Sequence, residues 1–103
     1  MVPTMSDRDA VIAKLIAARA DLERRGVEKL WLFGSMARGE DRPDSDVDLV
    51  FETRDGKPID IVSWGAMAAE VTDLLGRRVD IGPIDTVRPA IRDRMARDVV
   101  EIF

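Results

Sequence analysis

The sequence predicts a single small α/β (α+β) domain, spanning residues 1–103, in which a mixed β-sheet of about three strands is flanked by about four helices. Two observations lead to this prediction. Segments with apolar residues at helical spacing alternate with short apolar runs of strand length, and glycines or turns rich in Pro and Asp separate them. With 46% hydrophobic and 35% charged residues, the 103-residue chain suits one globular core and leaves no room for a second domain.

The first helix is expected to run from Ser6 to Arg25. Ser6 is a common type of N-cap residue, and Gly26 follows as a stop signal. The apolar positions of this helix recur at helical spacing, at Val11, Leu15, Ala18 and Leu22. Residues 1–5 are expected to be a disordered extension, and the sequence leaves open whether Met1 or Met5 is the natural start.

The apolar and aromatic run VEKLWLF (27–33) predicts a strand that is buried on both faces and ends at Gly34. SMARG (35–39) fits a single helical turn, and EDRPDS (40–45) fits a loop. DVDLVFET (46–53) alternates between polar and apolar residues before it becomes apolar, which predicts a second strand.

RDGKP (54–58) predicts a turn before the second long helix. That helix is expected from about Asp60 to Leu75, because its apolar residues keep helical spacing. Either Asp60 or Ser63 could cap its start, and Gly76 would stop it.

RRVDIGP (77–83) predicts a third short strand. The remaining segment, TVRPAIRDRMARDVVEIF (86–103), is expected to contain the last helix, with Pro89 near its start. The apolar stripe of that helix would consist of Ile91, Met95 and Val99.

The composition excludes several kinds of site. The chain has no cysteine and no histidine, which rules out disulfides, thiolate or histidine metal sites, Ser-His-Asp triads and histidine general bases. Its formal net charge of −4 argues against direct binding of nucleic acid. The N-terminus lacks signal-peptide features and no apolar run reaches membrane-spanning length, so we expect a cytoplasmic protein without membrane contact.

Three aspartates are candidate metal ligands. Because alternate side chains of a strand share a face, Asp46 and Asp48 should point the same way, with Cα atoms ~6.6 Å apart, and their carboxylates can converge on divalent ions. The core-facing residues of that strand would be Val47, Leu49 and Phe51. Asp80 follows the same in/out pattern on the third strand and supplies another carboxylate. Three such oxygen ligands suit Mg²⁺, with Mn²⁺ as an alternative.

Four residues are candidate phosphate ligands. Gly34 lacks a Cβ atom, so its backbone can approach an oxyanion closely, and Ser35 begins a helical turn whose N–H groups can hold phosphate oxygens. Arg38 could bind phosphate or pair with the carboxylates, and both interpretations stay open. Ser45, directly before the aspartate pair, completes the set.

Taken together, GS-x-AR-G (34–39), SD-x-D-L (45–49) and VDI (79–81) resemble the minimal nucleotidyltransferase (MNT) branch of the polymerase β-like nucleotidyltransferase superfamily. The resemblance extends from residue 27 to about residue 99, and RPAIRDRMARDVV looks like the last helix of that branch. It implies the fold of that superfamily, a small mixed sheet flanked by helices.

The resemblance also implies roles for the candidate residues. Asp46 and Asp48 would bind two divalent ions, Asp80 would help to bind the catalytic ion and favour the attacking hydroxylate, and Gly34 with Ser35 would hold the β and γ phosphates of ATP. The implied reaction is in-line attack of a hydroxyl on the α-phosphorus, with pyrophosphate as the leaving group. This chemistry needs no histidine, in agreement with the composition.

A partner follows from the same resemblance. MNT proteins are typically antitoxins of HEPN-type toxins, and some transfer AMP to a tyrosine of the toxin, whereas this chain contains no tyrosine. The leading interpretation is therefore a Mg²⁺-dependent adenylyltransferase that acts as an antitoxin on a HEPN-type partner. Two alternatives stay open, a non-catalytic antitoxin that blocks its partner sterically, and nucleotidyl transfer to a small molecule by a homo-oligomer.

Overall fold

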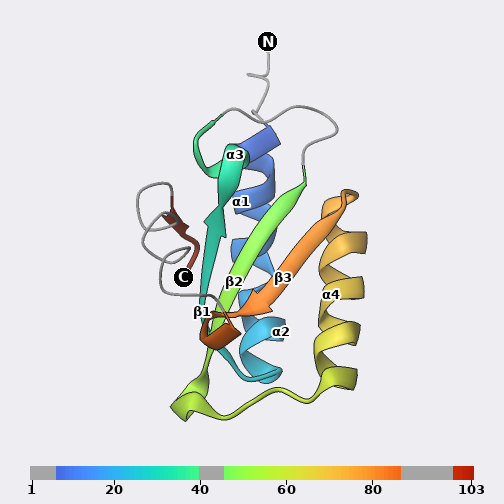
Figure 1. Ribbon diagram of the computed structural model, residues 1–103. Coiled ribbons are helices and arrows are strands. Elements are labelled where there is room, and N and C mark those ends of the chain that lie inside the picture. Colours follow the sequence, from blue (N-terminus) through green and yellow to red (C-terminus); the bar gives the residue numbers. More distant parts are fainter. Residues whose placement is uncertain (1–6, 40–45, 87–98) are drawn as a thin grey trace.

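The computed structural model describes residues 7–39, 46–86 and 99–103 (Figure 1). The elements follow in the order α1 (Asp7–Ala17), α2 (Arg19–Arg24), β1 (Val27–Phe33), α3 (Gly34–Ala37), β2 (Val47–Thr53), the 3₁₀ turn η1 (Arg54–Gly56), α4 (Ile61–Leu75), β3 (Val79–Pro83), the 3₁₀ turn η2 (Ile84–Thr86) and β4 (Val100–Glu101). The predicted α+β class is confirmed, with one strand more than expected among the described residues.

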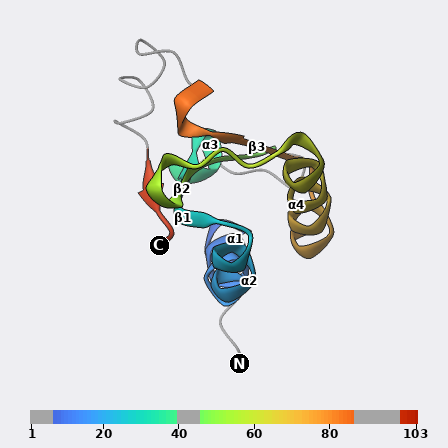
Figure 2. The same ribbon diagram turned by 90° about the horizontal axis from the view of Figure 1, so that it is seen from below.

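The four strands form one mixed sheet with the order β3-β2-β1-β4. β1 is antiparallel to both β2 and β4, while β3 is parallel to β2. Helices α1, α2 and α4 all lie on the same face of this sheet, as seen along its lower edge in Figure 2. The expectation that β1 is buried on both faces holds only for its second half, because Glu28 and Lys29 are exposed and Phe33 is buried.

The core lies between the sheet and these three helices. β2 contributes Val47, Leu49 and Phe51, as its alternation predicted. The buried residues that face them from the helices and β1 are Val11, Leu15, Leu22, Leu30, Leu32, Met67 and Val71. Full burial of each such side chain stabilises the fold by roughly 1.5–3 kcal/mol, so the apolar residues of β2 face the helices. The polar residues that alternate with them therefore lie on the opposite face of the sheet.

The predicted first helix is interrupted rather than continuous. Ala18 separates α1 from α2, and its N–H is shared between the carbonyls of Lys14 and Leu15, each at 3.1 Å. This local tightening toward a 3₁₀ turn needs neither glycine nor proline. The apolar spacing could not reveal it, because Leu15 and Leu22 remain buried on the two sides of the break.

Helix α4 matches its prediction closely. Of the two candidate caps, Asp60 is the one used, since its carboxylate accepts hydrogen bonds from the Ser63 N–H at 2.8 Å and the Ser63 hydroxyl at 3.1 Å. The Ser63 N–H and then the Ser63 hydroxyl hold the pKa of Asp60 below its ordinary value. Gly76 ends the helix in the left-handed region. None of the described helices is long and apolar enough to cross a bilayer.

Strand β4 was missed by the sequence prediction, which assigned its residues to the end of the last helical segment. Val100–Glu101 pairs antiparallel with β1, and the pairing continues beyond β4 through the Ile102 N–H, which donates to the Leu30 carbonyl at 2.8 Å. Two residues are too few to show any periodicity. The rest of that helical segment (87–98), the loop 40–45 and the extension 1–5 lie outside the described residues.

Candidate active site

The predicted site residues gather at one end of the sheet. β1 ends at Phe33, while β2 and β3 begin at Val47 and Val79. Because β1 is antiparallel to β2 and β2 is parallel to β3, these three strand ends lie next to each other, with α3 beside them (Figure 1).

The strand register sets two of the aspartates side by side. Asp48 of β2 stands opposite Asp80 of β3 in the parallel ladder and opposite Phe33 of β1 in the antiparallel one. Opposite residues of neighbouring strands point to the same face, and the strands are ~4.8 Å apart. Both carboxylates therefore lie on the face away from α1, α2 and α4, with Asp48 half-buried and Asp80 exposed.

The turn between β1 and α3 packs directly on the Asp48 carboxylate. A Cβ atom built on Gly34 would lie 2.7 Å from Asp48 Oδ2, well inside contact distance. Gly34 also has a φ of +80°, a conformation that side chains disfavour. The structure thus requires glycine here twice over, once for the backbone conformation and once for the space beside the carboxylate.

Electrostatics connect all three aspartates. Burial raises the pKa of Asp48 above its ordinary value, and the negative charges of Asp80 and then Asp46 raise that pKa further. Asp46 is exposed and directly precedes β2. A cation at this place would relieve the repulsion that Asp80 and Asp46 exert on the half-buried Asp48 carboxylate.

The donor set fits a divalent ion such as Mg²⁺, since it offers hard carboxylate oxygens. Across residues 7–39, 46–86 and 99–103, no three acidic side chains converge closely enough to hold a metal ion in the conformation seen. Asp48 and Asp80 stand on fixed, paired backbones, so side-chain rotation alone can bring their oxygens toward a shared ion.

Of the other candidate residues, two belong to α3 or to its end. Ser35 lies within α3, whose short helical turn starts at Gly34. Arg38 caps the C-terminal end of α3, is exposed, and donates its backbone N–H to the Gly34 carbonyl at 3.2 Å. Ser45 lies outside the described residues.

One positioning contact was not predicted from the sequence. Arg77, just before β3, donates to the Asp7 carboxylate at the start of α1 over 2.6 Å, and only 13% of the Arg77 side chain is exposed. This ion pair ties the start of β3, and with it Asp80, to the first helix. No local pattern could have indicated it, because seventy residues separate the partners.

Asp48→Asn is expected to raise the melting temperature of the metal-free protein at pH 7. The folded-state pKa lies above the ordinary value of 3.8, so ionising Asp48 in the folded protein costs stability at neutral pH. That cost vanishes as the pH falls through the folded pKa toward 3.8, so the advantage of the variant should shrink on acidification.

Thermal unfolding measured between pH 7 and about pH 4 checks this, with Asp73→Asn on the exposed surface of α4 as the matched control. An Asp48→Asn protein that is less stable than wild type at pH 7 would show that the carboxylate is held by favourable contacts instead.

Known proteins resemble this chain in sequence. The sequence profile of the family described as "Nucleotidyltransferase domain" matches residues 12–102. A protein of Methanocaldococcus jannaschii, named as a candidate protein adenylyltransferase, is 32% identical over 83 residues, which cover 80% of this chain and 86% of that protein. The protein adenylyltransferase MntA of Thermococcus cleftensis is 31% identical over 80 residues, covering 78% and 79% of the two chains.

Solved structures share the fold. A candidate minimal nucleotidyltransferase superposes with a TM-score of 0.77 at 30% identity, covering 95% of this chain and 98% of the other. A toxin–antitoxin complex with AMP-PNP gives 0.73 at 17% identity, covering 89% and 72%. A tri-AMPylated HEPN toxin of Shewanella oneidensis in complex with its MNT antitoxin gives 0.69 at 14% identity, covering 93% and 71%. At the last two identities the likeness concerns the fold alone.

Proposed function

The chain belongs to the nucleotidyltransferase domain family, in its minimal (MNT) form, and from this premise we propose that it is a Mg²⁺-dependent protein adenylyltransferase. In this proposal it transfers AMP from ATP to a HEPN-type toxin and thereby acts as the antitoxin. Two relatives at 31–32% identity carry names of protein adenylyltransferases, and structures of the same fold include MNT antitoxins bound to HEPN toxins.

One observation carries the catalytic part of the proposal. Asp48 is held between the Gly34 turn on one side and Asp80 on the other, and its carboxylate is half-buried among negative charges. A protein that only bound its partner would gain nothing from this repulsive arrangement, whereas a cation-dependent phosphoryl-transfer site requires it.

Different residues of the chain would bind the metal ion and the phosphates. Asp46, Asp48 and Asp80 would hold Mg²⁺, which when bound neutralises charge on the triphosphate and on the departing pyrophosphate. The backbone N–H groups at Gly34 and Ser35 bind the β and γ phosphates, because the missing Cβ lets the turn come close. These contacts hold the α-phosphorus in line with the attacking hydroxyl.

The transfer itself is a single displacement. A bond forms between the acceptor hydroxyl oxygen and the α-phosphorus, and the bond from that phosphorus to the bridging oxygen of the β-phosphate breaks, so pyrophosphate leaves with the electron pair. Asp80, exposed at the edge strand, accepts the hydroxyl proton and passes it to water.

Mg²⁺ together with ATP is expected to raise the melting temperature of the wild-type protein. At a free concentration ~100 times its dissociation constant, a ligand of the folded state adds about 2.7 kcal/mol to the free energy of unfolding. The Asp46→Asn/Asp48→Asn double variant should show no such increase relative to its own ligand-free protein. Differential scanning fluorimetry with Mg²⁺ alone, ATP alone and both together provides the measurement, and an equal increase in the double variant would remove the aspartates from the binding site.

A further inference from the structure

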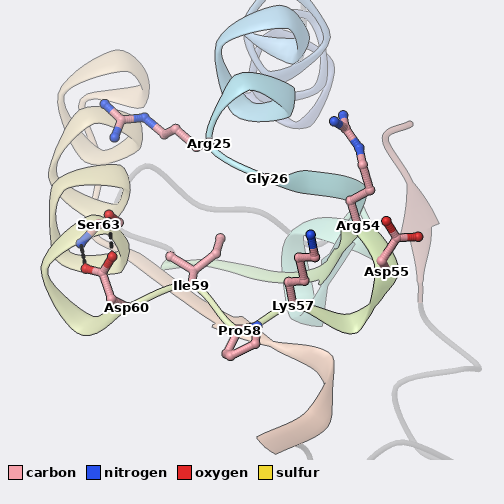
Figure 3. A pocket seen from close by; sticks show the side chains of 9 residues that line it. All are labelled: Arg25, Gly26, Arg54, Asp55, Lys57, Pro58, Ile59, Asp60 and Ser63. Carbon is pink, nitrogen blue, oxygen red and sulfur yellow. Dashed lines mark hydrogen bonds between the residues drawn. The ribbon is translucent and has the colours of Figure 1, made fainter.

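A second surface lies at the opposite end of the sheet. It surrounds a hollow of about 330 Å³ between the junction of α2 and β1, the turn η1 and the start of α4 (Figure 3). We call it the basal surface and define it by Arg54, Lys57, Pro58 and Ile59, which line the hollow, and by Ile61 and Val62, which follow the lining residue Asp60 in the chain. The sequence predicted a turn at residues 54–58 and a helix from about Asp60, and neither prediction indicates a binding surface.

Its apolar part is unusually exposed. Ile61 and Val62 have 81% and 77% of their surface accessible, more than the other large hydrophobic residues among the described ranges. Both lie in the first turn of α4, and the Asp60 cap holds that turn in place. Exposed apolar side chains that lie next to each other on an ordered helix mark a candidate interaction site, because a partner surface would remove them from water.

Its charged part has no ion-pair partner among the described residues. Arg54 and Lys57 are exposed, and neither forms an ion pair with another described residue. By contrast Arg25, which also lines the hollow, is held by Glu70 at 2.5 Å. In Figure 3, Lys57 and Ile59 rise from the loop in the same direction, with the carboxylates of Asp55 and Asp60 to either side of them.

The turn that carries the two cations is fixed by the backbone. The Arg54 N–H donates to the Gly26 carbonyl at 3.0 Å, and the Lys57 N–H donates to the Arg54 carbonyl at 3.2 Å. Asp55 between them has a φ of +57°, a backbone conformation that is uncommon for residues other than glycine. Little conformational freedom of the backbone is therefore left to lose when a partner binds.

We propose that the basal surface docks the acceptor protein of the proposed function, by taking a segment in which an apolar side chain is flanked by carboxylates. Carboxylates match Arg54 and Lys57, which form no ion pair with another described residue, and the apolar side chain covers Ile61 and Val62. A nucleic acid fits this surface less well, because it would leave the aliphatic side chains of Ile61 and Val62 uncovered. This inference rests on the proposed function only for the identity of the occupant.

The distance to the active site sets the size of the occupant. Asp48 and Arg54 are separated by six residues of extended chain, or ~20 Å. An acceptor protein must therefore span ~20 Å to touch the basal surface and also present a hydroxyl to the aspartates. Contacts remote from the reacting atoms are then a source of affinity and selectivity for that protein.

Isothermal titration of the purified chain with the purified HEPN-type protein tests the proposal. The Arg54→Glu/Lys57→Glu variant and the Ile61→Asp variant should each weaken binding at least about tenfold. Ile16→Asp on α1 is the matched apolar control, since Ile16 is also exposed, and Lys14→Glu is the charge control; both should bind like wild type. Circular dichroism confirms that each variant is folded.

Transfer assays separate this proposal from the proposed function. In both basal variants KM for the whole HEPN-type protein should rise, whereas KM for ATP and the rate with a short peptide carrying the acceptor tyrosine should stay unchanged. If binding depends on the basal surface but wild type transfers no AMP, the docking proposal stands and the catalytic one fails.

Three results would overturn the docking proposal. The first is binding to the HEPN-type protein that is absent in wild type or unchanged in both basal variants. The second is a wild-type dimer in sedimentation experiments that Ile61→Asp dissociates, because the surface would then join two copies of this chain. The third is binding of an RNA oligonucleotide that Arg54→Glu/Lys57→Glu abolishes.

Discussion

Asp48→Asn is expected to reduce AMP transfer at least about a hundredfold while leaving the folded protein no less stable than wild type. The substitution removes the carboxylate that stands between the Gly34 turn and Asp80, so one negative ligand of the cation is lost. A loss of about 2.7 kcal/mol of transition-state stabilisation corresponds to a hundredfold, and metal-ligand carboxylates contribute on this scale. The same change removes the repulsion that raises the Asp48 pKa.

Pyrophosphate release with the acceptor protein, saturating ATP and Mg²⁺ tests the expected loss of activity, and thermal unfolding of the same variants tests the expected stability. Asp73→Asn again serves as the control for loss of a surface carboxylate and should keep full activity. Inactivity together with a lower melting temperature would mean that the variant simply fails to fold well, and retained activity would place the chemistry elsewhere.

Gly34→Ala is expected to have the second-largest effect, again about a hundredfold on transfer. The new Cβ would lie 2.7 Å from Asp48 Oδ2, so the carboxylate must move aside, and a displacement of ~1 Å in a reacting constellation costs about two orders of magnitude. The φ of +80° adds strain of about 1 kcal/mol, which lowers the melting temperature by a few degrees.

Gly76→Ala separates the effect of the contact with Asp48 from the effect of the backbone strain at a positive φ. Gly76 has a φ of +64° and nothing within 4 Å of an added Cβ, so this variant should lose stability to a similar extent but keep its activity. Equal activity losses in the two variants would show that backbone strain, and not the contact with Asp48, limits catalysis.

Much of the site could be predicted from the sequence because it depends on short-range geometry. Asp48 and Asp80 each stand between core-facing apolar neighbours, and this alternation alone assigns them to the outer face of the sheet. The step from Phe33 to Gly34 likewise marks where β1 ends and the turn begins.

Contacts between distant segments could not be predicted in this way. The parallel register that sets Asp48 opposite Asp80, and the approach of Gly34 to Asp48, follow from how the strands pack rather than from any local pattern. The break at Ala18 could not be predicted, because Leu15 and Leu22 are buried on its two sides as they would be in a continuous helix. Strand β4 has only two residues, which are too few to show a periodic pattern. The proposed docking role of Arg54 and Lys57 could not be predicted for another reason, because exposed cations in a turn resemble those of an ordinary solvated loop.

Intact-mass spectrometry of the HEPN-type protein, incubated with this chain, ATP and Mg²⁺, decides between catalysis and steric blocking. We expect the acceptor to gain the mass of one or more AMP units, the gain to require both ATP and the divalent ion, and Asp48→Asn to eliminate it. An unmodified acceptor that is nevertheless bound and inhibited equally by wild type and Asp48→Asn would contradict the proposed catalysis, because the chain would then act by steric blocking.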